Sequence, residues 1–117
     1  MSQRIEKANS LIQEIVAEII RKDLSLKPSV FVSILKVDTS SDLRYARVFL
    51  SVYPASEGDY AFKTLQKELH RIQKALNQKL QMKILPKIIF QLDNTQEKVD
   101  QLEEIFQKIK EEDKQDN

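Results

Sequence analysis

Residues 38–53 read Asp-Thr-Ser-Ser-Asp-Leu-Arg-Tyr-Ala-Arg-Val-Phe-Leu-Ser-Val-Tyr, and they join a polar turn to an alternating strand. The Asp, Ser and Thr side chains of residues 38–42 can bond nearby backbone groups in competition with regular structure. Beyond them the pattern alternates, and one face of the strand would hold Ala46, Val48, Leu50 and Val52. The other face would hold Leu43, Tyr45, Arg47, Phe49, Ser51 and Tyr53. This pattern predicts a strand that packs one face under helices and presents the other to water or a partner.

The segments on both sides predict the remaining elements. Apolar residues at spacings of three and four indicate helices, and short apolar runs after prolines indicate strands. The predicted elements are a helix over 4–22, a strand over 30–37, a strand over 43–53, a helix over 62–80, a strand over 87–93 and a last helix from an N-cap at Asn94 to Ile109. The two neighbouring strands are predicted to form an antiparallel hairpin. The order α-β-β-α-β-α predicts an α+β fold with helices on one face of a three-stranded sheet.

Composition limits the protein class. The 117 residues suffice for one domain, and contents of 41% apolar and 32% charged residues are typical of a folded soluble protein. We expect a single domain over 1–110 and a flexible acidic tail over 111–117. The chain has no cysteine, no apolar start and no run long enough for a membrane span, so we expect a cytoplasmic protein.

Catalytic and metal chemistry lack candidate residues. His70 is the only histidine, Gly58 the only glycine, and the Asp38–Asp42 pair fits turn-stabilising bonds better than acid–base chemistry. The sequence therefore predicts a protein that is not an enzyme and that uses no cofactor, metal or small-molecule substrate.

The charge is unevenly distributed along the chain. Residues 1–90 hold 15 Lys and Arg against 9 Asp and Glu, a balance of +6, whereas residues 91–117 hold 4 against 9, a balance of −5. Such asymmetry fits an anion-binding body with an acidic tail, and it also fits an uneven solvated surface. The positions predicted to bind RNA or DNA phosphates are Arg4, Lys7, Arg44, Arg47, Lys63, Lys67, Arg71 and Lys74.

The aromatic face of the predicted second strand has two interpretations. Tyr45, Phe49 and Tyr53 could stack on bases, or they could pack under loops or the last helix. The residues alone leave both open, with packing the preferred one.

Two short motifs resemble a known family. Ser40-Ser41-Asp42-Leu43 followed by Tyr45-Ala46-Arg47-Val48 resembles the S-S-D-L-x-Y-A-[KR]-V signature of ribosome-binding factor A. The family's later P-x-[LI]-x-F-x-x-D-x-S motif is similar to Leu85-Pro86-Lys87-Ile88 with Phe90, Asp93 and Asn94. The resemblance extends over nearly the whole chain.

The resemblance implies a K-homology-like domain of the second topological type. It further implies a bacterial assembly factor, monomeric when free, that binds the precursor small ribosomal subunit and its ribosomal RNA. Such a factor assists late maturation of that RNA, including in the cold. The alternative is a K-homology-like module that binds protein and makes no RNA contact.

One departure concerns the second helix. K-homology domains clamp single strands with a Gly-x-x-Gly loop, and the family resembled replaces that loop by a helix interrupted at a small residue and glycine. The matching positions here, Glu68-Leu69-His70, contain no glycine. Either a straighter helix or a kink enforced by packing is compatible with this sequence.

Overall fold

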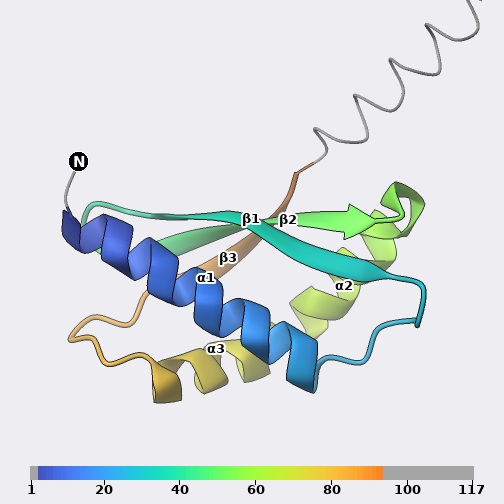
Figure 1. The fold of residues 1–117 in the computed structure, drawn as a ribbon. Helices are drawn as coiled ribbons and strands as arrows, with labels where there is room; N and C mark the ends of the chain where they lie inside the picture. Colours follow the sequence, from blue (N-terminus) through green and yellow to red (C-terminus); the bar gives the residue numbers. More distant parts are fainter. Residues whose placement is uncertain (1–2, 94–117) are drawn as a thin grey trace, which may run out of the picture.

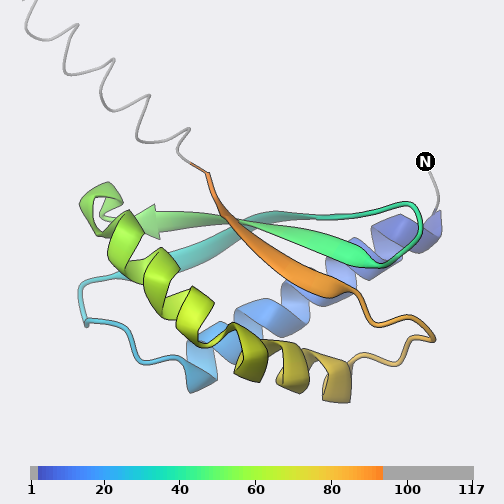
Figure 2. The same cartoon turned by 180° about the vertical axis from the view of Figure 1, so that it is seen from behind.

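Three strands form one sheet, and helices cover one of its faces (Figure 1). The computed structural model of the protein describes residues 3–93. Its elements in chain order are α1 (Gln3–Asp23), β1 (Phe31–Thr39), β2 (Tyr45–Tyr53), a short 3-10 helix η1 (Ala55–Glu57), α2 (Gly58–Lys67), α3 (Leu69–Lys79) and β3 (Lys87–Leu92). Seen from behind, α1 and the α2–α3 pair still lie on the same side of the sheet (Figure 2).

β2 is the central strand of this sheet. It pairs antiparallel with β1 and parallel with β3, so that Thr39 and Ile88 both flank Ala46. The register shifts between Ile34 and Lys36, which makes Leu35 an extra residue in β1. A bulge of this kind bends the strand that carries it.

The core lies between the sheet and the helices. Ala46, Val48 and Leu50 on β2 are fully buried, and they share one face of the strand because successive side chains alternate. Helix α1 buries one apolar stripe against this face, namely Ala8, Ile12, Ile15, Val16, Ile19 and Ile20. The predicted aliphatic side of the strand is therefore confirmed as the covered side, although Val52 near its end is only half-buried.

The predicted α+β class and element order are confirmed through β3. The prediction of a last helix and an acidic tail concerns residues 94–117, which lie outside the described residues. No helix between residues 3 and 93 combines the length and the apolar character needed to cross a membrane.

The predicted turn boundaries were wrong by two residues. Asp38 and Thr39 belong to β1, where they pair with Arg47 and Ala46, and β2 begins at Tyr45. Leu43 does not lie on the aromatic face as predicted. It occupies the turn with φ of 61°, and its side chain is buried in the core.

The second helical segment is interrupted at Glu68, whose φ and ψ of −93° and 4° separate α2 from α3. The two helices have different main partners, since α2 packs against β2 and β3 whereas α3 packs mainly against α1 and also contacts β3. Leu65 and Ile72 are buried on either side of the break. Of the two shapes left open by the sequence, the structure therefore has the kink, and packing supplies it without a glycine.

Candidate nucleic-acid interface

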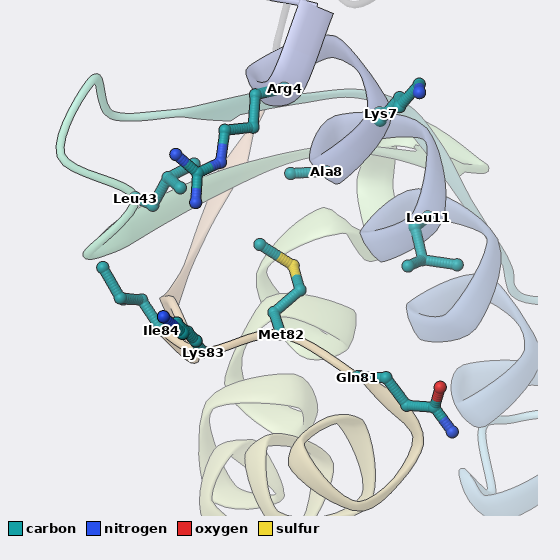
Figure 3. Close-up of a pocket in the computed structure, with 9 residues that line it drawn as sticks. All are labelled: Arg4, Lys7, Ala8, Leu11, Leu43, Gln81, Met82, Lys83 and Ile84. Carbon is teal, nitrogen blue, oxygen red and sulfur yellow. The ribbon is translucent and has the colours of Figure 1, made fainter.

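A hollow of about 330 Å³ lies where the start of α1 meets the β1–β2 turn and the loop before β3. Arg4 extends from α1 toward the turn that carries Leu43, and Met82 points toward Ala8 (Figure 3). Three segments far apart in the sequence build this hollow, which is lined by Arg4, Lys7, Ala8, Leu11, Leu43, Gln81, Met82, Lys83 and Ile84. Its floor is apolar and several of its lining residues are cationic.

The β1–β2 turn holds its shape by a closed set of hydrogen bonds. Asp42 Oδ1 accepts from Ser40 Oγ at 2.6 Å and from the Arg44 backbone N–H at 3.1 Å. The Tyr45 N–H donates to Ser40 Oγ at 3.1 Å, and the Ser40 N–H donates to the Tyr45 carbonyl at 2.8 Å. The Ser40 hydroxyl and then the Arg44 N–H hold the pKa of Asp42 below its ordinary value. The predicted Asx bonding is confirmed for Asp42 but wrong for Asp38, which lies in β1.

The turn also fixes the start of β3. The Lys87 N–H donates to the Arg44 carbonyl at 2.8 Å, and the Ile88 N–H donates to Gln73 Oε1 on α3 at 2.8 Å. Gln73 Nε2 in turn donates to the Pro86 carbonyl at 3.0 Å. These bonds place the loop 80–86 beside the turn, so that Lys83 reaches the same hollow as Arg4 and Lys7.

We define the terminal cluster as Arg4, Lys7, Arg44, Lys83 and Lys87. The first two were predicted RNA-binding positions and line the hollow, and Arg44, also predicted, directly follows Leu43 in the turn. Lys83 and Lys87 were not among the predicted positions. Lys83 lies in an aperiodic loop, and its only signal was the Lys-rich run around Pro86.

The other predicted cations of the helices form a second group. Lys63 and Lys67 lie on α2, Arg71 and Lys74 lie on α3, and all four are exposed. Figure 2 shows the two helices running in different directions, so these four cations lie along two helix axes. Arg71 Nη1 lies 3.7 Å from Glu68 Oε2, whereas the three lysines form no ion pair with any residue in 3–93.

Arg47 belongs to neither group. It lies on the sheet face opposite the helices, and its Nη2 is 3.6 Å from Asp38 Oδ2 on β1. Tyr45 and Tyr53 share this outer face and are 49% and 72% exposed. In the described part of the chain, nothing packs over these rings.

The surface around the hollow offers cationic and apolar side chains for binding, and it holds few groups that could react chemically. Among the described residues no three His, Asp or Glu side chains converge on a possible metal position. His70 lies exposed on α3, close to the break at Glu68. Lysines and arginines around a shallow apolar hollow suit contacts to a phosphate backbone, which carry affinity without sequence readout.

Comparison with known proteins identifies the family to which the chain is similar. A sequence model described as ribosome-binding factor A matches residues 4–106. The ribosome-binding factor A of Dictyoglomus thermophilum is 36% identical over 122 residues, which span 100% of this chain and 99% of that protein. The crystal structure of ribosome-binding factor A from Thermus thermophilus matches with a TM-score of 0.65 and 20% identity, over 75% of this chain and 94% of that chain. A homology model of the Thermus thermophilus factor, fitted into the electron cryo-microscopy map of a 30S complex, matches with a TM-score of 0.61 and 23% identity, over 73% of this chain and 90% of that chain.

Proposed function

This chain belongs to the ribosome-binding factor A family, and we propose that it binds the small ribosomal subunit through the subunit's RNA. The observation that carries the proposal is the family match over residues 4–106, which covers every element of the described body. The 30S complex of the Thermus thermophilus factor supports the choice of the small subunit.

The terminal cluster supports RNA as the component contacted. Its cations come from α1, the β1–β2 turn, the loop 80–86 and the start of β3. Hydrogen bonds hold the turn, α3 and the start of β3 together, and the Thr39 N–H at the end of β1 donates to Asn9 Oδ1 on α1. A rigid set of cations can match phosphates that a folded RNA presents in a fixed arrangement. Such binding reads the shape of the RNA more than its bases.

We further propose that the bound protein assists late maturation of the subunit RNA, including at low temperature. A protein that binds one RNA conformation more tightly than its competitors raises the population of that conformation without any chemical step. RNA helices that compete with this conformation persist longer in the cold. The shift in population that the protein causes therefore has its largest effect at low temperature. Depleting the protein should then raise the fraction of small-subunit RNA with unprocessed ends, and more so in the cold. An unchanged fraction at every temperature would remove this part of the proposal.

Sedimentation with purified small subunits tests the binding itself. We expect the protein to travel with small subunits at about 50 mM salt and to be released progressively toward about 200 mM, because phosphate contacts displace counterions. Lys7→Glu should weaken this binding. Arg21→Glu is the matched control, since it makes the same charge change at an exposed position near the other end of α1. Sedimentation away from subunits at low salt, or equal weakening by both variants, would contradict the proposal.

A further inference from the structure

The hollow beside the terminal cluster has an apolar floor that contacts to phosphates do not need. Ala8 and Leu43 are buried in this floor, and half-buried Met82 points toward Ala8 (Figure 3). Leu11 and Ile84 line the same hollow and remain 41% and 43% exposed. Apolar side chains around a concave site mark a place where a ligand with an apolar part is bound.

The charged residues that line the hollow are all cationic. They are Arg4, Lys7 and Lys83, and no aspartate or glutamate lines the hollow beside them. The occupant should therefore combine an apolar group with negative charges on both sides of it. A nucleotide within an RNA chain has this chemistry, because each base stands between two phosphates. An apolar protein side chain would need carboxylates at matching positions to suit the same cations.

The floor is fixed in place by the β1–β2 turn. Leu43 has a φ of 61°, a conformation that glycine or asparagine adopts more readily than leucine. Hydrogen bonds among Ser40, Asp42 and Tyr45 hold the turn in this shape, and the leucine side chain forms part of the floor. Backbone strain that the surrounding structure maintains is typical of preorganised binding sites. The shape of the hollow is thus set before a ligand arrives.

The size of the hollow suits one base. Its volume of about 330 Å³ lies near the lower end of the range of about 300–1,000 Å³ for small-molecule sites. The thioether of Met82 can lie against the face of an aromatic ring, because sulfur is polarisable. Ala8 and Leu43 carry no hydrogen-bonding side chain, so this floor should discriminate little between one base and another.

We propose that the hollow receives one unpaired base of the RNA, while Arg4, Lys7 and Lys83 contact the phosphates on either side of it. This inference rests on the proposed function and adds the class of RNA that the terminal cluster prefers, namely RNA with a bulged or single-stranded nucleotide. A base within a duplex would first have to leave its stack and its partner, which makes fully paired RNA the weaker ligand.

Methyl NMR of Met82 in the full-length chain tests the proposal, because the sequence holds only two methionines, Met1 and Met82. The probes are three short RNA duplexes: one with a single bulged adenosine, one with an abasic residue at the bulge, and one fully paired. The ring current of the bulged adenosine should move the Met82 methyl signal upfield. The abasic duplex presents the same number of phosphates, yet it should leave the signal in place and bind about tenfold more weakly.

Two neighbouring substitutions separate the floor of the hollow from the rest of its loop. Ile84 lines the hollow, whereas Leu85 has a similar exposure of 40% and does not line it. Ile84→Ser should reduce the preference for the bulged over the abasic duplex severalfold, and Leu85→Ser should keep the wild-type preference. Neither substitution changes a charge, so both variants should keep the salt dependence of RNA binding.

Three results would overturn the proposal. The first is a Met82 signal that the bulged duplex does not move, or that the abasic duplex moves equally. The second is an equal loss of preference in the two serine variants. The third is a signal that stays in place with every duplex and moves only when the proteins of the small subunit, stripped of RNA, are added, which would assign the hollow to a protein side chain.

Sedimentation with small subunits separates this inference from the proposed function. A chain that sediments with subunits in a salt-dependent manner but shows no preference for the bulged duplex would overturn the inference alone. A chain that prefers the bulged duplex but sediments away from subunits at low salt would support the inference and overturn the proposed function.

Discussion

The hydroxyl of Ser40 controls the ionisation of its neighbour Asp42 across the β1–β2 turn. Hydrogen bonds from Ser40 Oγ and the Arg44 N–H stabilise the carboxylate form, which lowers the pKa of Asp42 in the folded protein. A lowered folded-state pKa contributes stability that is present above the unfolded pKa and is lost as pH falls through the folded value. The turn is therefore expected to weaken in acid, below the ordinary range of an aspartate.

Ser40→Ala tests this assignment. Removing the larger of the two stabilising bonds should move the pKa of Asp42 upward toward its ordinary value, as followed by carboxyl NMR signals between about pH 2 and pH 6. Glu18 provides an internal reference, because Lys22 lowers its pKa through a 2.8 Å contact on another element. An unmoved Asp42 titration, or a parallel shift of Glu18, would refute the role of the Ser40 hydroxyl.

Residue-scale prediction from sequence succeeded where the chemistry is local. Polar side chains in 38–42 predicted turn bonding, because Asx bonds depend on a few adjacent residues. The positive φ of Leu43 was not predictable in this way, since an apolar residue rarely adopts it and its burial in the core supplies the compensation. The place of Thr39 was also missed, because its pairing with Ala46 and the bond from its N–H to Asn9 Oδ1 at 2.9 Å are long-range.

Thr39→Val should stabilise the protein. The Thr39 side chain is buried, and its Oγ1 has no hydrogen-bond partner within residues 3–93. Valine keeps the shape and the backbone bond to Asn9 while removing the unsatisfied hydroxyl, so we expect a gain of about 1 kcal/mol, or roughly 4 °C in Tm. Thr39→Ser, which keeps the hydroxyl and loses the methyl group, should lower Tm. A fall in Tm for Thr39→Val would mean that the hydroxyl is satisfied in solution.

At the scale of elements, the break between α2 and α3 shows why periodicity alone was insufficient. Apolar residues from Phe62 to Leu80 keep helical spacing across Glu68, so the sequence pattern runs on without a visible stop. The break lets α2 pack on the sheet while α3 packs mainly on α1, and these partners exist only in the folded chain. Gly58, the only glycine in the sequence, lies at the start of α2 and has ordinary helical φ and ψ of −57° and −48°.

The close approach of Gly58 to Leu92 explains why a glycine stands at position 58, and it yields a prediction. A Cβ at this position would lie 3.2 Å from Leu92 Cδ2, so the start of α2 approaches the end of β3 closely. We expect Gly58→Ala to cost more stability when Leu92 is present than in a Leu92→Ala background. The coupling should be on the order of 0.5 kcal/mol or more in a double-mutant cycle of denaturant midpoints. Additive effects would show that the side chain of Leu92 moves away freely.

At the scale of the whole molecule, charge and fold were predictable to different degrees. The positive balance of residues 1–90 fitted both an anion-binding body and an uneven solvated surface, whereas the family motifs identified the class of the protein. Three of the five residues of the terminal cluster were predicted. Lys83 and Lys87 were not, because they join it through the loop 80–86 and the start of β3, whose positions are fixed by Gln73. Arg47 was predicted for RNA, yet the strand register places it beside Asp38 on the outer face.

The separation of the terminal cluster from Arg47 on the opposite face leads to a prediction for the salt dependence of subunit binding. Each phosphate contact contributes about 0.7 to 0.9 to the slope of log affinity against log salt. If the terminal cluster contacts phosphates, Lys7→Glu combined with Lys83→Glu should reduce the slope by about 1.5 while the circular dichroism spectrum stays unchanged. Arg47→Glu should leave the slope near the wild-type value, because its charge is already paired on the opposite face. A larger loss of slope from Arg47→Glu than from the double variant would move the RNA contact to the outer sheet face and displace the terminal cluster from that role.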